Sequence, residues 1–560
     1  MTCFLFNPST IHAQDTRWID FENGLWSDFG NWSNGVPGAN SSAFIGIGQI
    51  TQNTVGGATI RELEYDWGTS DITLDTDLTV TDHFIWGDGT ISGNANLILQ
   101  GTAEVNDGRL EATVESFADV DVDPFVFFNG AGGQGVWNNR AGAKFNLFSD
   151  SDLAFDSTFN NFSGGTIHKQ QSGEARFNWN LNSSGLIQAD SGRLSILGNS
   201  TFNGEMLIGN NATIDFGTIR DYDFGVGAQV NGTGTLELSA GTTTVDNTLN
   251  VNSDFRMDGT STLTGSGTLN INGSLDWDSG RMLGTGVTNL NNGGLITGGG
   301  LQRTLNNFGY VDFQPFVFLS GTTSSSVWNN KDGAVVELTN DQGFAFEGTI
   351  NNEQGATFRK TSSGRTSIAW DFCNDGLLDL QNGVIWFQGE FKQGNTGTIA
   401  LNGGSFIADD WTLNGTIQGS GVVDSPDTVV TGTLNPGNPT GTLTFDGDLT
   451  VQSTAVSNFD LGTISDLIVV QGDLSLGGTL NLFGLDGFGA GQYVLFDYNG
   501  SFTDNGLIIN SAPAGFEYSL FNDTVNRAYV VSVTTAVPEP SGIIVLSALT
   551  TVALSRRRRI

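Results

Sequence analysis

The organisation of this chain is set by the stretch WNNRAG at residues 137–142, which places an Asn after an apolar residue and a Gly four positions after that Asn. Related stretches follow at a spacing of 22 residues, and the same spacing returns in the second half of the chain, where Cys373 falls in register. A fixed period near 22 residues predicts a solenoid in which each repeat is one coil. We therefore expect structural Asn residues at the coil corners, namely Asn138, Asn160, Asn182, Asn329, Asn351 and Asn395.

The segments between these Asn residues are short and alternate apolar with polar positions, as in residues 143–148 and 194–197. Such alternation predicts strands with one buried face. Asn tolerates left-handed backbone angles at a tight bend, and Gly permits the next bend. In stacked coils the Asn amides would hydrogen-bond along the axis. The predicted fold class is all-β, a parallel β-helix (solenoid) with coils of ~22 residues, followed by a short C-terminal hydrophobic helix.

An internal duplication supports this fold. Residues from about 69 to 198 match residues from about 260 to 389 without a gap. A solenoid accepts a copied block because each coil contacts only its neighbours, whereas a globular copy would need its own core and a linker. The residue pairs that lie 191 positions apart include Trp86 with Trp277, Trp137 with Trp328, Lys169 with Lys360, and Trp179 with Trp370.

The composition is rich in turn-forming residues and acidic. Gly accounts for 78 of 560 residues, and 38% hydrophobic residues with 39 Phe provide a long core. The 59 acidic and 22 basic residues give a net charge of −37, which leaves no basic groove for nucleic acid. Cys3 and Cys373 provide neither a disulfide framework nor zinc-ligand spacing.

The chain divides into five predicted segments. Residues 1–13 are read as the remnant of a signal peptide, although the basic start and the ~7–15 apolar residues of a full signal are missing; an ordinary N-terminus is the alternative. Residues 14–48 form a Trp-rich N-terminal cap. Residues 49–430 form the β-helix with its duplication, residues 431–533 form C-terminal coils and a cap, and residues 537–560 form a sorting tail.

One acidic run raises the question of a metal. Asp119, Asp121 and Asp123 alternate, so their carboxylates share one face of a strand, and oxygen ligands of this kind suit Ca²⁺. The copy 191 residues later keeps only Asp312. A solvated acidic face is therefore favoured, and we predict no metal site and no cofactor, with Ca²⁺ as the alternative.

No catalytic residues are predicted. Polysaccharide lyases and hydrolases often use β-helices, and their sites need paired carboxylates, or carboxylates with Arg or Lys, on neighbouring coils. Lys169, Arg176 and Arg193 supply such groups, but no spacing assembles them into a site. The histidines, which are His12, His83 and His168, form no catalytic triad pattern. Whether the chain is an enzyme is left open, and a non-enzymatic role is favoured.

Residues near both ends of the predicted β-helix carry a family resemblance. The run GTLNPGNPTGTLTF at residues 432–445 is followed by further strand-like segments, and residues 24–32 form a Trp-rich start. Both segments resemble parts of bacterial surface proteins with autotransporter-type β-helix repeats. The resemblance implies an exported surface protein and says nothing about its ligand.

The C-terminal tail carries a second resemblance. Val537, Pro538, Glu539 and Pro540 precede an apolar run from residue 542 to 554, and Arg556, Arg557, Arg558 and Arg559 follow it. This order resembles the PEP-CTERM sorting tail of Gram-negative surface proteins. The resemblance implies export, recognition by an exosortase and removal of the hydrophobic helix. The arginines would act as a membrane stop on the cytoplasmic side, although the apolar run is shorter than the ~20 residues that span a bilayer.

Together these features predict a cell-surface or extracellular-matrix protein of a Gram-negative bacterium. We expect a structural or adhesive scaffold associated with exopolysaccharide or surface glycans, held transiently in the inner membrane by its C-terminal helix and sorted by an exosortase-type enzyme. The alternative is a secreted polysaccharide lyase or glycoside hydrolase on the same scaffold.

Overall fold

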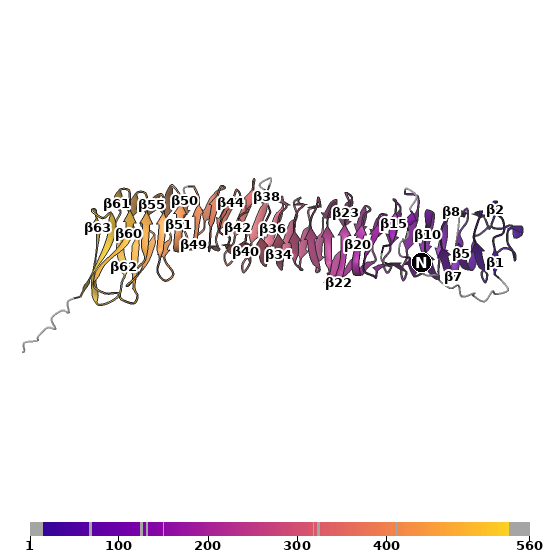
Figure 1. The fold of residues 1–560 in the computed structure, drawn as a ribbon, viewed down its shortest axis with the longest axis horizontal. Helices are drawn as coiled ribbons and strands as arrows, with labels where there is room; N and C mark the ends of the chain where they lie inside the picture. The colour runs from indigo at the N-terminus through magenta and orange to yellow at the C-terminus, as the bar shows by residue number, and fades with distance from the viewer. Residues whose placement is uncertain are drawn as a thin grey trace, which may run out of the picture.

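The chain forms a long rod of stacked parallel strands (Figure 1). The computed structural model describes residues 15–65, 70–123, 127–129, 133–148, 150–316, 318–321, 325–409 and 411–536. The predicted all-β parallel β-helix is confirmed. The proposed signal segment, the sorting motif at Val537–Pro540 and the arginine stop lie outside the described residues. Within them, no helix is long and apolar enough to cross a membrane.

The coils stack on three faces, with one strand on each face in many coils and with one long strand, such as β20 (Leu186–Ile196), covering two faces in others. Each strand pairs in parallel with the strand one coil away, and the residues opposite one another are 22 apart in the first copy, as for Trp137, Phe159 and Leu181. The spacing falls to 20 between Leu249 and Leu269. We name the faces by strands of the first copy: the first face holds β13 (Val136–Asn139) and β16 (Thr158–Asn161), the second β14 (Lys144–Leu147) and β17 (Thr166–Lys169), and the third β15 (Asp152–Ala154) and β18 (Glu174–Phe177).

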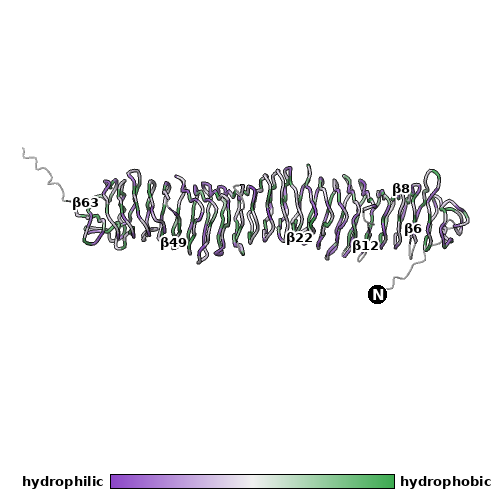
Figure 2. Tube along the Cα trace, turned by 90° about the horizontal axis from the view of Figure 1, so that it is seen from above, coloured by the Kyte–Doolittle hydropathy of each residue, from purple (hydrophilic) through white to green (hydrophobic). Residues whose placement is uncertain are grey.

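The core follows from the alternation of side chains along each strand. In β16 and β17 every second residue is buried, so that Phe159 and Ile167 point inward while Thr and His side chains point outward. The same alternation runs along the whole rod (Figure 2). Aromatic rings stack through the interior: Trp137 lies parallel to Phe159 with ring centroids 6.4 Å apart. The rod is therefore held by apolar burial between successive coils.

The predicted structural Asn residues form a ladder on the outside of the rod. Asn160 donates to Asn138 at 2.8 Å, and Asn182 donates to Asn160 at 2.9 Å. Asn351 donates to Asn329 at 2.8 Å. These residues lie inside strands rather than at bends, since each is the third residue of a four-residue strand. The Asn residues that the sequence placed at the coil corners therefore lie one residue before the corners.

Asn395 does not join this ladder. It lies in the turn that follows β48 (Phe391–Gln393). The ladder position opposite Cys373 is taken by Lys392, because the coil here is shorter than 22 residues.

The corners are marked instead by the residue that follows each ladder residue, which is Asn except after Asn182, where it is Ser183. Asn330 donates to Asn352 at 3.0 Å, and Asn352 donates to Asn374 at 2.8 Å and to the carbonyl of Leu377 at 3.1 Å. These side chains are buried, and their amide groups bond both the next coil and the chain as it turns. Two adjacent Asn residues share one period, which is why spacing alone did not distinguish the outer ladder from this inner ladder.

The two ends of the rod are closed differently. Parallel pairing already begins with β1 (Thr16–Arg17) against β3 (Ser42–Ile45), so the Trp-rich segment is itself a first coil. Trp26 and Trp32 are buried there in an edge-to-face contact of 4.8 Å. At the other end, β60 (Gly491–Tyr498) and β63 (Phe516–Asp523) pair antiparallel with β64 (Ala528–Thr535). These elements cover the outermost strand edges against further pairing.

The duplicated block returns one face away from its original. Starting at β13 and moving along the first face, nine successive pairings lead to β38 (Leu319–Gly321). The 191-residue copy of Trp137, however, is Trp328 in β39 (Val327–Asn330), the next strand along the chain, which lies on the second face. The copy is thus displaced by nine coils and one further face.

Candidate functional site

A groove on the first face of the second copy combines exposed aromatic rings with polar groups. It lies around β41 (Phe344–Ala345) and β44 (Arg365–Ile368), next to the start of β38, and has a volume of about 420 Å³. Its lining includes Phe318, Phe346, Asp341, Gln342 and Arg365. Pockets of this composition, with aromatic walls and a few polar groups, are suited to binding.

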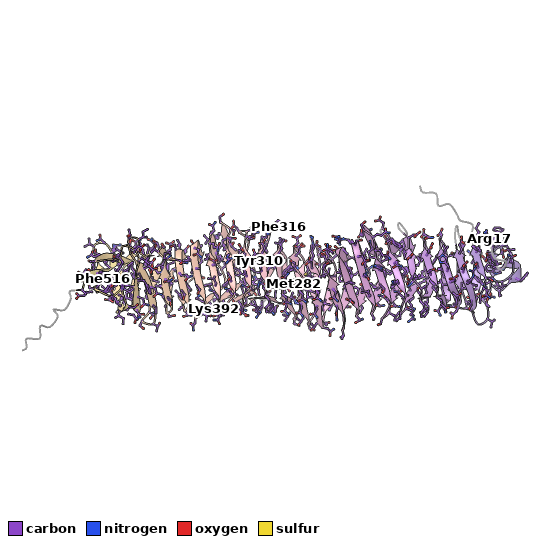
Figure 3. All side chains as sticks on the ribbon, turned by 90° about the horizontal axis from the view of Figure 1, so that it is seen from below. Arg17, Met282, Tyr310, Phe316, Lys392 and Phe516 are labelled. Carbon is purple, nitrogen blue, oxygen red and sulfur yellow. The ribbon has the colours of Figure 1, made fainter. Side chains whose placement is uncertain are left out.

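Phe346 is the most unusual residue of the groove. Its side chain is 62% exposed, and its backbone has a positive φ of 67°. A bulky residue with positive φ is a steric outlier, and such strain costs about 1–3 kcal/mol. The ring meets that of Phe318 edge to face, with centroids 5.8 Å apart. Phe316, 79% exposed, lies at the outer edge of the rod two residues before Phe318 (Figure 3).

The core beneath the groove holds Phe346 in this position. Trp370 is fully buried and donates its indole N–H to the carbonyl of Ala345 at 3.0 Å. Gly348 permits this packing, since a Cβ there would lie 2.4 Å from the Trp370 ring. With the Ala345 carbonyl bonded inward, the next residue leaves the core with a positive φ and its side chain faces solvent.

Asp341 is held in the groove by a buried lysine. Lys360 is 0% exposed, and its Nζ lies 3.3 Å from Asp341 Oδ1 and 2.9 Å from Thr366 Oγ1. Burial lowers the pKa of Lys360, and Asp341 opposes this shift. Burial also raises the pKa of Asp341, but hydrogen bonds from Ser362 and Lys360 outweigh it and leave that pKa below its ordinary value. The groove therefore presents an oriented, ionised acceptor beside the aromatic rings.

Arg365 supplies the donor at the rim. Its side chain is exposed and its guanidinium carbon lies 4.5 Å from the centre of the Trp386 ring, in a cation–π contact. The guanidinium carries five N–H donors, which a cation–π contact does not use.

The framework of the groove recurs in the first copy. Phe155 is 63% exposed with φ of 61°, and Trp179 donates to the carbonyl of Ala154 at 3.1 Å. Lys169 is fully buried there, where burial lowers its pKa and Asp150 opposes the shift. The rim differs, since Glu174 stands where the second copy has Arg365. The strained Phe, the Trp beneath it, the buried Lys and its Asp are thus all duplicated.

These Phe residues were missed by sequence reasoning, although a signal was present. The tripeptides Ala154-Phe155-Asp156 and Ala345-Phe346-Glu347 lie 191 positions apart, each with an acidic residue directly after the Phe. The signal is the repeat of this tripeptide; an acidic neighbour alone does not mark an outward ring, since the buried Phe445, Phe459 and Phe496 are also followed by Asp. The positive φ itself has no sequence signature here, because neither position carries the usual Gly or Asn.

A larger groove near the end of the duplication lacks an exposed aromatic face. It measures about 560 Å³ and is lined by residues that include Phe391, Lys392 and Trp411. Trp411 is only 6% exposed, and Phe391 packs against it. Lys392 pairs with Glu390 at 2.7 Å across an open surface. This groove is therefore a weaker candidate than the one around Phe346.

The acidic run considered for Ca²⁺ is spread over several interactions. Asp121 accepts a hydrogen bond from Asn146 at 2.7 Å. Burial raises the pKa of Asp123, and Glu104 and Asp121 raise it further. In the described part of the chain, no group of three or more His, Cys, Asp or Glu residues is arranged to hold a metal ion.

The basic residues weighed for catalysis do not converge. Arg193 pairs with Asp215 at 3.0 Å and with Glu237 at 2.6 Å, both of which are nearly buried. Arg176 pairs with Glu174 on its own strand at 3.3 Å. Lys169 points into the core, and its Nζ bonds the carbonyl of Gln171. Each therefore has a structural partner on the rod.

Comparison with known proteins gives a local match. No family model matches the chain. A segment of 97 residues, 16% of this chain, is 41% identical to part of the adhesin BmaC autotransporter of Brucella suis biovar 1 (strain 1330) and spans 3% of that protein. Among solved structures, the Hap adhesin of Haemophilus influenzae aligns over 88% of this chain and 63% of its own, with 11% identity and a TM-score of 0.30. The chain is thus similar to an autotransporter adhesin over a short stretch.

Proposed function

We propose that this chain is an exported cell-surface rod with an adhesive role. The observation that carries the proposal is the groove around Phe346, where the fold keeps a strained aromatic ring exposed beside a fixed carboxylate; the strained, exposed ring is repeated at Phe155. An exposed ring at a strained position contributes nothing to the core, so a binding role explains it best. The local identity to an autotransporter adhesin supports the same reading.

We further propose that the tail directs the rod to the surface. In this proposal an exosortase-type enzyme recognises Val537, Pro538, Glu539 and Pro540, the hydrophobic helix holds the chain in the inner membrane until processing, and the arginines from Arg556 to Arg559 stay inside. The rod then associates with exopolysaccharide or surface glycans. The support is the order of these three elements in the sequence.

The adhesive role is tested in the producing bacterium. Protease added to intact cells should remove the rod, and deletion of the gene should lower attachment to a surface or to the extracellular matrix. Complementation with the full chain should restore attachment, and the double variant Phe155→Gly, Phe346→Gly should restore it poorly. A rod protected from protease in intact cells, or unchanged attachment after deletion, would contradict the proposal.

The sorting proposal needs its own test. Mass spectrometry of the surface protein should show a C-terminus close to Pro540, without the arginines. Replacing Glu539 and the two flanking prolines with alanine should leave the tail attached and the protein in the membrane fraction. An intact C-terminus on the mature surface protein would contradict the proposed removal of the tail.

A further inference from the structure

We infer that the rod carries two glycan-binding sites, one in each copy, which take neutral polysaccharide and open on different faces. This inference rests on the proposed adhesive function and names its ligand. The second site is the groove at Phe346 and Asp341. The first is the matching position 191 residues earlier, at Phe155 and Asp150.

The aromatic part of each site suits the apolar face of a sugar ring. The exposed fractions of Phe155 and Phe346 are nearly equal, at 63% and 62%, as are their φ angles of 61° and 67°. The C–H groups on one face of a hexose pack against an aromatic ring, and an exposed, rigidly held ring loses little entropy on contact. In the second copy Phe318 adds a second wall edge to face with Phe346.

The polar part supplies partners for sugar hydroxyl groups. Asp341 accepts hydrogen bonds and is fixed by Lys360 and by the backbone N–H of Gly364 at 2.9 Å. Gln342 and Arg365 line the same groove and donate. A hydroxyl group both donates and accepts, so a carboxylate between amide and guanidinium donors matches it. The fixed carboxylate avoids the loss of side-chain entropy on binding.

Charge selects a neutral glycan over an acidic one. The chain carries a net charge of −37, so a polyuronate approaching the rod is repelled. Acidic groups also lie at the sites themselves: Glu347 directly follows Phe346, Asp156 directly follows Phe155, and the carbonyl of Glu174 accepts from the N–H of Asp150. Uncharged hexose chains meet no such repulsion. Because Glu174 replaces Arg365, the first site should disfavour anions more strongly than the second.

The arrangement of the sites makes the rod a cross-linker. The copies are nine coils and one face apart, and at ~4.8 Å per coil the sites lie about 45 Å apart along the axis. They open on adjacent faces of one continuous β-helix. A single extended glycan lying along one face meets only one site. One rod therefore joins two polysaccharide chains, and many rods turn a soluble polysaccharide into a network.

The test uses the purified full chain and soluble polysaccharides of known composition. Neutral glucan, galactan and mannan are compared with a polyuronate by isothermal titration and by light scattering. We expect a neutral polysaccharide to bind at two sites per chain and to raise scattering through cross-linking. The variants Phe155→Gly and Phe346→Gly should each remove one site and abolish the scattering increase, while the double variant should bind at least tenfold more weakly.

Matched controls separate ligand contact from folding. Glycine accepts a positive φ, so both variants should keep the circular dichroism and melting temperature of the parent. Phe21→Ala removes another Phe, 78% exposed and far from both sites, and should leave binding and scattering unchanged.

Three outcomes would overturn the inference. They are binding of the polyuronate alone, full binding by the double variant, and parent rods that associate with each other through the Phe residues without any glycan. If the glycan-binding measurements give one of these outcomes while gene deletion still lowers attachment, the ligand assignment is wrong and the adhesive function stands. If glycan binding is found but the rod is protected from protease in intact cells, the surface function fails instead.

Discussion

The indole N–H of Trp370 donates to the carbonyl of Ala345 at 3.0 Å, at the residue directly before the outward-facing Phe346. Replacing Trp370 with Phe leaves this partly buried carbonyl without its partner and shrinks the ring. We expect a loss of about 2–4 kcal/mol of local stability, from the unpaired carbonyl and the lost packing together. Hydrogen exchange of the amides around Phe346 in the full chain measures the loss.

Trp328 provides the matched control for this prediction. It is equally buried, but its indole nitrogen has no hydrogen-bond partner in the structure. Trp328→Phe therefore removes similar volume without breaking a bond, and should cost less than Trp370→Phe. Equal losses at the two positions would show that packing, rather than the bond to Ala345, holds the groove.

The two Asn ladders should differ sharply in their contribution to stability. Asn352 is 1% exposed and bonds Asn330, Asn374 and the carbonyl of Leu377. Asn352→Ala therefore leaves buried polar groups without partners on both sides and should lower the free energy of unfolding by about 2–4 kcal/mol. Asn351 is on the outer, partly exposed ladder, and Asn351→Ala should cost less than about 1 kcal/mol. Thermal unfolding of the two variants compares them directly, and a larger effect at Asn351 would reverse the roles assigned here.

The strained Phe should be dispensable for folding. Its φ of 67° lies in the left-handed region, which costs an ordinary residue roughly 1–2 kcal/mol and glycine almost nothing. Phe346→Gly should therefore keep or raise the melting temperature, even though it removes an aromatic ring. A clear drop in melting temperature would mean that the ring stabilises the rod by packing, and the binding explanation would lose its basis.

The C-terminal coils should become more stable as the pH falls through 6. Asp466 is 2% exposed, and burial raises its pKa from the ordinary 3.8 to about 6. The hydrogen bonds that it accepts from the N–H groups of Asp460 and Gly441 lower the pKa, but by less than burial raises it. The folded state takes up a proton at a higher pH than the unfolded chain, so this group contributes stability that is complete below about pH 4 and lost above about pH 6. This pKa shift corresponds to a change of about 3 kcal/mol in the free energy of unfolding.

Asp466→Asn isolates this effect from the many other carboxylates. The variant cannot titrate, so its stability should change less between pH 4.5 and 7.5 than that of the parent. Hydrogen exchange of β57 (Leu467–Val470), the strand that begins after Asp466, gives the measurement. An identical pH dependence in both proteins would show that Asp466 keeps its ordinary pKa in the fold.

The fold was predictable from sequence because its determinants are local and periodic. The 22-residue spacing of Trp137, Phe159 and Leu181 states which residues stack, and the structure pairs these residues. The groove was not predictable in the same way. Its key feature is the backbone angle of Phe346, which lies directly after a residue bonded by Trp370 of the next coil. Spacing reveals that two residues recur, but not which way a side chain leaves the core.

The displacement of the duplicate by one face shows that the elementary unit of this rod is smaller than a coil. The three faces accept the same residues, since Trp137 and Trp328 are both buried although they lie on different faces. Inserting or deleting one strand with its turn, about seven residues, would thus rotate everything downstream onto the next face without disturbing the core. Evolution, or a protein engineer, can in this way re-aim a binding surface by changing chain length alone.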